Sequence, residues 1–336
     1  MNRCYLAWGK KFWFLLLVGA VLEVYSMGVP LSEAADYPTK GIEVIVSWSA
    51  GGGQDTMTRL MTVRLAKHWG VPVSVVNKPG GMGIPGAVEV LQSKPDGYTV
   101  LSESNATSSL LDAWGKDVPF NIRDKTYLAS GVGYVYFLCA STHTGWKNLA
   151  DLEQAVDRDP SSIRWGWLGG TAGLDVITAM SRAALAKKTS VDKVKQIKMI
   201  TYPGSGPIIP AQAGGHIELS AQPPSGCLSL TGAGKAHLLA VGDVHRSPIF
   251  PDVPTAAEQG WPDVKSVMWI GFSGPKGLPP NVVQAWEKGI EAVLKDPGLK
   301  ADLEKLGAVA LYKSSADLTK HVLNEAEEIK ALPAFK

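Results

Sequence analysis

A run of glycines stands directly between a predicted strand and a predicted helix, and this arrangement restricts the fold more than any other feature. The β-branched segment 42–46 (IEVIV) is typical of a buried strand. Three glycines follow at 51–53, and apolar residues then recur at helical spacing as far as Trp69. Strands and helices continue to alternate along the chain, which predicts an α/β fold with mostly parallel sheets.

A second turn of the same kind occurs more than 100 residues later. The segment 163–167 (IRWGW) predicts a strand, and LGGTAGLD at 168–175 opens a helix that runs to about Lys187. In open α/β sheets, ligands bind at the carboxyl ends of strands, beside helix N-termini. The two turns therefore predict two sheets that face one ligand-binding cleft.

The first glycine loop has the chemistry of an anion site. Backbone N–H groups and the dipole at a helix start favour a negative charge. A nucleotide-binding P-loop needs Lys and then Ser or Thr after its glycines, but Gln54 follows Gly53 here. We therefore expect a carboxylate, with a plain tight turn as the alternative. Asp55 fits a helix cap better than an acid catalyst, and Trp48 could lie against an apolar part of a ligand.

The first 35 residues have the pattern of a secretory signal peptide. Arg3, Lys10 and Lys11 precede an apolar stretch, and small residues up to Ala35 offer a cleavage site. An uncleaved anchor is the alternative, although the clean apolar run is shorter than the roughly 20 residues of a membrane span. The rest of the chain is nearly neutral, which argues against binding to nucleic acid or to a membrane surface.

Motifs for catalysis or metal binding are not found. The six histidines are scattered, and neither HExxH nor GxSxG occurs. Segment 81–86 matches GxGxxG, but Pro85 inside it argues against a dinucleotide site. We therefore expect no enzyme, no cofactor and no metal. Cys139 and Cys227 are expected to be buried thiols, with a disulfide between them as the alternative.

Five motifs, taken in order, resemble a known family. They are YPTK at 37–40, AGGGxD at 50–55, NKPGGxG at 77–83, PDGYT at 95–99 and PDVPTxxExG at 251–260. Together they resemble the extracytoplasmic solute-binding proteins of tripartite tricarboxylate transporters, the Bug family, over about residues 36–325. The resemblance implies a two-lobe, type II-like periplasmic-binding-protein fold with a ligand cleft between the lobes. Lobe 1 would hold residues 36–140 and 270–336, and lobe 2 residues 141–269.

The resemblance also implies a ligand, a partner and a binding site. Members of this family hold carboxylated solutes through backbone amides and ordered waters, and they serve the membrane subunits of a transporter. Carried over residue by residue, lobe 1 would contribute Trp48, Ser49, Gly51, Gly52, Gly53, Asp55, Ser104 and Asn105. Lobe 2 would contribute Trp167, Gly169, Gly170, Thr171, Ala172, Asp175, Tyr202, Gly204, Ser205 and Gln222.

The chain departs from the family pattern inside both glycine turns. Prolines are usual where Ser47 and Ser49 stand, Phe is often found in place of Trp48, and the Ser and His common near the second helix start are replaced. We predict a periplasmic receptor for a small organic carboxylate, with Trp48 and Trp167 as a wall for an aromatic or bulky acid. A ligand sensor for a membrane kinase and an exported enzyme on the same cleft remain the alternatives.

Overall fold

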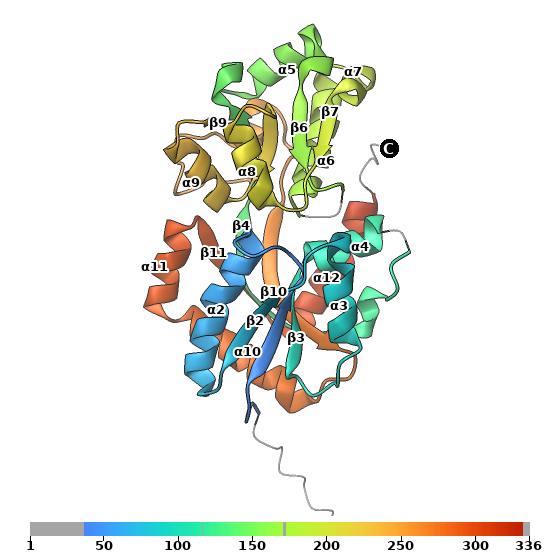
Figure 1. The fold of residues 1–336 in the computed structure, drawn as a ribbon, viewed down its shortest axis with the longest axis vertical. Helices are drawn as coiled ribbons and strands as arrows, with labels where there is room; N and C mark the ends of the chain where they lie inside the picture. Colours follow the sequence, from blue (N-terminus) through green and yellow to red (C-terminus); the bar gives the residue numbers. More distant parts are fainter. Residues whose placement is uncertain (1–36, 116, 171–172, 332–336) are drawn as a thin grey trace, which may run out of the picture. The chain divides into compact units, whose positions relative to one another are not determined.

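Two mixed sheets organise the residues that the computed structural model describes, which are 37–115, 117–170 and 173–331 (Figure 1). The first sheet has the order β11-β4-β10-β3-β1-β2, and the second has the order β7-β6-β8-β5-β9. We call the first sheet with its helices lobe 1 and the second sheet with its helices lobe 2. The strands are β1 (Ile42–Val46), β2 (Val73–Asn77), β3 (Thr99–Ser104), β4 (Lys125–Val135), β5 (Phe137–Ser141), β6 (Arg164–Trp167), β7 (Lys198–Thr201), β8 (Leu219–Gln222), β9 (Ala236–Val241), β10 (Val267–Pro275) and β11 (Ala308–Lys313).

Helices flank each sheet. Lobe 1 carries α2 (Gly53–Trp69), α3 (Ile84–Leu91), α4 (Ser109–Trp114), α10 (Pro280–Leu294), α11 (Pro297–Lys305) and α12 (Ser315–Lys330). Lobe 2 carries α5 (Leu149–Arg158), α6 (Gly173–Lys188), α7 (Val191–Gln196), α8 (Ser205–Ala213) and α9 (Pro224–Gly232). In lobe 1, α2 packs against α10, whereas α12 packs against α4 and β4. The fully buried Trp286 of α10 holds the first pair together, because its ring meets that of Trp69 at a centroid distance of 5.0 Å.

Only part of each sheet is parallel, which corrects the prediction of mostly parallel sheets. In lobe 1, β1 pairs in parallel with β2 and β3, whereas β10 is antiparallel to β3 and β4. In lobe 2, β6 is parallel to β7 and β8, whereas β5 is antiparallel to β8 and β9. The cause in lobe 1 is the chain path: β4 leads out of the lobe, β10 leads back into it, and the two lie side by side. The strand β11, which lies between α11 and α12 in the chain, is also antiparallel to β4.

The chain crosses from lobe 1 to lobe 2 at Tyr136; we call the crossing segment, with the returning start of β10, the strand passage. The apolar and aromatic segment 134–140 (YVYFLCA) is divided there between β4, which belongs to the first sheet, and β5, which belongs to the second. The return strand β10 pairs with β4 so that Met268 lies opposite Tyr134. We propose lobe boundaries at Tyr136 and at the start of β10, in place of the expected boundaries at Ala140 and Trp269.

The two cysteines lie in the core of lobe 2. Cys139 of β5 and Cys227 of α9 are both fully buried in one apolar cluster, and their sulfur atoms are 3.4 Å apart. The structure has them as free thiols. Burial raises the pKa of the Cys227 thiol, so this side chain stays neutral.

The expected signal peptide at 1–35 lies outside the described residues. Among the residues that are described, no helix is both long enough and apolar enough to cross a bilayer.

Candidate functional site

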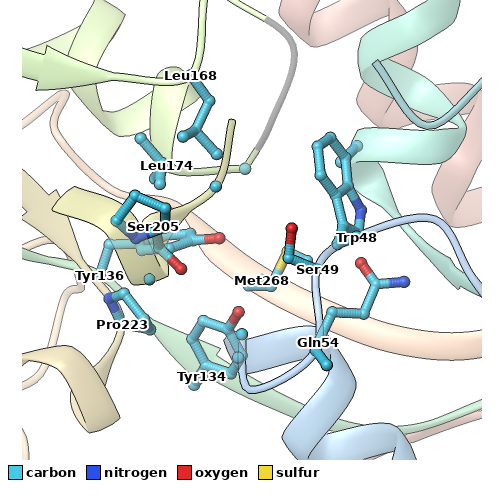
Figure 2. Close-up of a pocket in the computed structure, with 18 residues that line it drawn as sticks. Trp48, Ser49, Gln54, Tyr134, Tyr136, Leu168, Leu174, Ser205, Pro223 and Met268 are labelled. Carbon is cyan, nitrogen blue, oxygen red and sulfur yellow. The ribbon is translucent and has the colours of Figure 1, made fainter. Parts of the chain in front are cut away.

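A pocket is enclosed where the two glycine turns, the strand passage and the start of α8 meet (Figure 2). Its volume is about 90 Å³, which is room for a small molecule. Lobe 1 contributes Trp48, Ser49, Ala50, Gly52, Gly53, Gln54 and Ala106; the passage between the lobes contributes Tyr134, Tyr136 and Met268. Lobe 2 contributes Leu168, Gly173, Leu174, Gly204, Ser205, Gly206, Pro207 and Pro223. These eighteen lining residues include no charged side chain.

The first glycine loop bends sharply before α2 begins. Gly51 has a φ of 76°, a left-handed conformation that glycine adopts without steric cost. Gly52 precedes the helix with extended backbone, and Gly53 is the first helical residue. The N–H groups of this first turn have no acceptor within the helix, so they can donate to a bound anion.

Asp55, the third residue of α2, holds this loop from behind. Its carboxylate accepts from the N–H of Gly51 at 2.9 Å, from Arg59 Nε at 3.0 Å and from Asn77 Nδ2 at 2.8 Å. The same Asn77 amide donates to the Trp48 carbonyl. Burial alone would raise the pKa of Asp55, but the hydrogen bonds from Arg59, Gly51 and Asn77 outweigh it and lower this pKa. Asp55 is therefore a positioning residue, and it lies outside the pocket lining.

Asp175 does the same in the second loop. It is the third residue of α6, and its carboxylate accepts from the N–H of Leu168 at 2.8 Å and of Gly170 at 3.0 Å. Gly169 and Gly170 have φ values of 88° and 89°, which an L side chain rarely adopts. The loop thus turns back on its own helix and brings Leu168 to the pocket.

Two tyrosines from the strand passage form one wall of the pocket. The rings of Tyr134 and Tyr136 meet edge to face at 5.5 Å. Burial raises the pKa of Tyr134 to about 12 and raises the pKa of Tyr136 well above its usual value, so both hydroxyls remain neutral.

Each tyrosine hydroxyl lies against the first residue of one helix. A Cβ added to Gly53 would lie 2.5 Å from the Tyr134 hydroxyl, and one added to Gly173 would lie 2.7 Å from the Tyr136 hydroxyl. Both distances are shorter than real Cβ atoms show, so a side chain at either position would force the tyrosine to shift. The tyrosine pair thereby contacts the N-terminus of α2 in lobe 1 and that of α6 in lobe 2.

The structure brings some of the predicted residues together and separates others. The predicted residues that line the pocket are Trp48, Ser49, Gly52, Gly53, Gly204 and Ser205. The predicted residues outside the lining are Gly51, Asp55, Ser104, Asn105, Trp167, Gly169, Gly170, Asp175, Tyr202 and Gln222. Thr171 and Ala172 lie outside the described residues. Ser104, Asn105 and Gln222 are almost completely buried at strand ends, and Asn105 lines a separate cavity with Trp269 and Glu325. Of the predicted wall, Trp48 lines the pocket and Trp167 does not; the next residue, Leu168, lines the pocket on the side opposite Trp48.

Sequence reasoning overlooked several lining residues, including Gln54, Tyr134, Tyr136, Gly173 and Met268. One pattern could have indicated the tyrosines. Residues two apart in an extended chain point to the same side, and the segment 134–136 (YVY) lies shortly before the predicted crossing near Ala140. Gly173 and Leu174 stood inside the second predicted turn, LGGTAGLD at 168–175, but were not among the residues carried over from the family.

The fold and the site together define a two-lobe periplasmic-binding protein, in which a pocket lies between two α/β lobes joined by crossing strands. Residues 57–333 match the TctC family, described as the tripartite tricarboxylate transporter family receptor. The chain belongs to this family, and it is a solute-binding protein of the TctC/Bug group.

Individual relatives agree with this assignment. The protein BugT of Bordetella pertussis is 27% identical over 320 residues, which cover 94% of each chain. The structure of the periplasmic binding protein BugD is 24% identical, covers 88% of this chain and 97% of its own, and superposes with a TM-score of 0.80. The structure of MatC from Rhodopseudomonas palustris with bound malate is 22% identical, with 88% and 99% coverage and a TM-score of 0.80.

Proposed function

We propose that this protein binds a small organic carboxylate in the pocket between its lobes and delivers it to the membrane subunits of a tripartite tricarboxylate-type transporter. The protein would work in the periplasm after export and removal of residues 1–35. Closure of the lobes on the ligand would signal the loaded state to the membrane subunits. The pocket would bind its ligand without altering it.

One observation carries this proposal: three helix N-termini meet at a pocket without charged side chains. The helices α2 and α6 present Gly53 and Gly173 there, and α8 presents Ser205 after the extended Gly204. Helix N-termini supply N–H donors and a positive end of the dipole, which suit a carboxylate. The described lining also offers no acidic, basic or imidazole group for proton transfer, which favours binding over catalysis.

The energetics of such a site are sufficient. A hydrogen bond to a charged group contributes about 1.5–3 kcal/mol. Three or four of them, offset by the cost of closure and ordering, would leave about −8 kcal/mol, which corresponds to micromolar affinity. Neutral donors also avoid the burial of a cation that would lack a partner in the empty cleft.

A related structure and the pocket lining suggest which carboxylic acids to test first. Malate bound to MatC makes aliphatic dicarboxylates the first ligands to test. Trp48 on one side, and Leu168 with Leu174 on the other, give the pocket apolar surfaces, which would also accept an aromatic acid. Figure 2 shows Trp48 on one side of the pocket and the two leucines across from it.

The test is a thermal-shift screen of the protein without its first 35 residues, unfolded and refolded to remove any carried-over solute. The panel holds aliphatic di- and tricarboxylates, aromatic carboxylates, amino acids, sugars and NAD(H). A ligand at 100 times its dissociation constant should stabilise the protein by about 2.7 kcal/mol. We expect shifts with carboxylic acids only, and recovery of the acid unaltered after prolonged incubation. A shift with sugars or NAD(H) alone, or conversion of the acid, would contradict the proposal.

A further inference from the structure

The carboxamide of Gln54 is held on one side only. Gln54 is the second residue of α2 and is 4% exposed. Its Nε2 donates to the Ser102 carbonyl oxygen at 2.8 Å and to Ser102 Oγ at 3.1 Å. Its Oε1 is buried and accepts no hydrogen bond from the residues that the structure describes. Buried acceptors are nearly always paired, so this oxygen calls for a partner.

The network around Ser102 fixes which end of the amide faces which way. Thr58 Oγ1 donates to the Gln54 backbone carbonyl at 2.7 Å, so it must accept from Ser102 Oγ, also at 2.7 Å. Ser102 Oγ can then only accept from the Gln54 amide. A flipped amide would set two oxygens 2.8 Å apart at the Ser102 carbonyl. Oε1 is therefore the free end, and it can act only as an acceptor.

That free end lies on the pocket side. Gln54 is one of the lining residues, and Figure 2 shows its carboxamide below Trp48, with the oxygen nearer to the centre of the pocket and the nitrogen farther away. Among the described lining residues, the other side chains with polar N–H or O–H groups are Ser49, Ser205, the two tyrosines and Trp48, and all of these can donate. Within the described lining, Gln54 Oε1 is the side-chain oxygen that can only accept. A carboxylate oxygen placed beside it would be repelled, so it demands a donor.

We propose that Gln54 selects ligands that carry a hydrogen-bond donor, a hydroxyl or an ammonium group, beside their carboxylate. The helix N-termini would hold the carboxylate, and Gln54 Oε1 would accept from the neighbouring donor. This inference rests on the proposed function, because it assumes that the pocket binds a carboxylic acid. A site built to pair with a donor rejects the analogue that lacks it far better than an apolar site can reject an additional group.

The experiment compares acids that differ only in the donor, by calorimetric titration of refolded protein. The pairs are malate and succinate, 2-hydroxyglutarate and glutarate, and mandelate and phenylacetate, with aspartate as the ammonium analogue of malate. We expect the donor-bearing acid of the pair that fits the pocket to bind at least tenfold more tightly. Gln54→Met keeps the length but removes the acceptor, and it should reduce that preference to twofold or less. Ser102→Ala keeps the Ser102 carbonyl that orients the amide, so it should retain the preference.

The outcomes separate this inference from the proposed function. Equal affinity for both members of every pair in the wild-type protein would overturn the role of Gln54 while leaving carboxylate binding in place. A preference that survives in Gln54→Met, with unchanged circular dichroism, would do the same. Binding of no carboxylic acid at all would refute the proposed function, and this inference with it. Should Gln54→Met fail to fold, Gln54→Leu removes the same acceptor and takes its place, and equal affinity for both members of every pair in the wild-type protein would still overturn the inference.

Discussion

The two glycine turns share one three-residue pattern but differ in its middle residue. In lobe 1, α2 opens with Gly53, Gln54 and Asp55; in lobe 2, α6 opens with Gly173, Leu174 and Asp175. Each glycine lies against a tyrosine hydroxyl, and each aspartate accepts hydrogen bonds from the loop before its helix. The middle residues both line the pocket, one polar and the other apolar.

This difference indicates that the two lobes recognise different parts of a ligand. The shared glycines and aspartates set the backbone, so both helix starts can meet a ligand in the same way. The residue between them then decides what each lobe recognises. Lobe 1 faces the pocket with Gln54 and Trp48, whereas lobe 2 faces it with Leu174 and Leu168. We infer that lobe 1 provides most of the polar selectivity and lobe 2 an apolar cover.

The largest effect is expected when the shared glycines are replaced. Gly53→Val would place a Cβ 2.5 Å from the Tyr134 hydroxyl, and Gly173→Val one 2.7 Å from the Tyr136 hydroxyl. Either change should weaken ligand binding by roughly 100-fold or more and cost about 1–3 kcal/mol of stability through overpacking. Titration calorimetry and urea unfolding measure both quantities. Gly232→Val is the control, because open space surrounds its Cβ position and it lies outside the pocket. If only one of the two variants lost affinity, the two helix starts would not meet the ligand in the same way.

The aspartates come next in size of effect. Asp55→Ala and Asp175→Ala should each weaken binding about tenfold, because each loop loses the acceptor that shapes it. Asp55→Ala should also lower the free energy of unfolding by about 2–3 kcal/mol, since Arg59 and Asn77 lose a buried partner. Urea unfolding with calorimetry separates the two effects. Full affinity in a destabilised Asp55→Ala protein would show that the loop keeps its shape without the carboxylate.

The outline of this arrangement could be predicted from the sequence, but its contacts could not. The segments 42–46 and 163–167 with the glycines after them indicate two strand–turn–helix units, because local propensity and turn chemistry decide them. The resemblance to the family supplied the two lobes. Tyr134 and Gln54 escaped prediction because their place in the pocket depends on the pairing of β4 with β10 and on the Ser102 network, which are long-range contacts. Cys139 and Cys227 were expected to be buried, yet their 3.4 Å separation could not be read from the sequence.

The pH dependence of stability should show how much the charge of Asp55 in lobe 1 contributes. The pKa of Asp55 is lower in the folded protein than its ordinary value of 3.8. The stabilisation from its ionised form is therefore fully present above that ordinary pKa, and it is lost as the pH falls through the folded pKa. In urea unfolding between pH 7 and pH 2.5, the wild-type protein should exceed Asp55→Asn in stability at neutral pH by about 1 kcal/mol. This difference should shrink below about pH 4. A constant difference across the range would mean that the charge of Asp55 contributes nothing to stability.

The last comparison makes the lobe 1 loop resemble its counterpart, and for an aliphatic acid its expected effect is the smallest of all. Trp48→Leu gives both sides of the pocket a leucine, since Leu168 faces Trp48 from lobe 2. Trp48 also packs beside Ala106 and Leu110, so the variant should lose some stability whatever it binds. An aliphatic acid needs only an apolar surface and should bind within about threefold of wild type, whereas an aromatic acid loses ring stacking and should weaken by about tenfold. Calorimetry with one acid of each kind tests this difference. Equal losses for both would mean that Trp48 acts through loop packing, and the recognition assigned to lobe 1 would then rest on Gln54 alone.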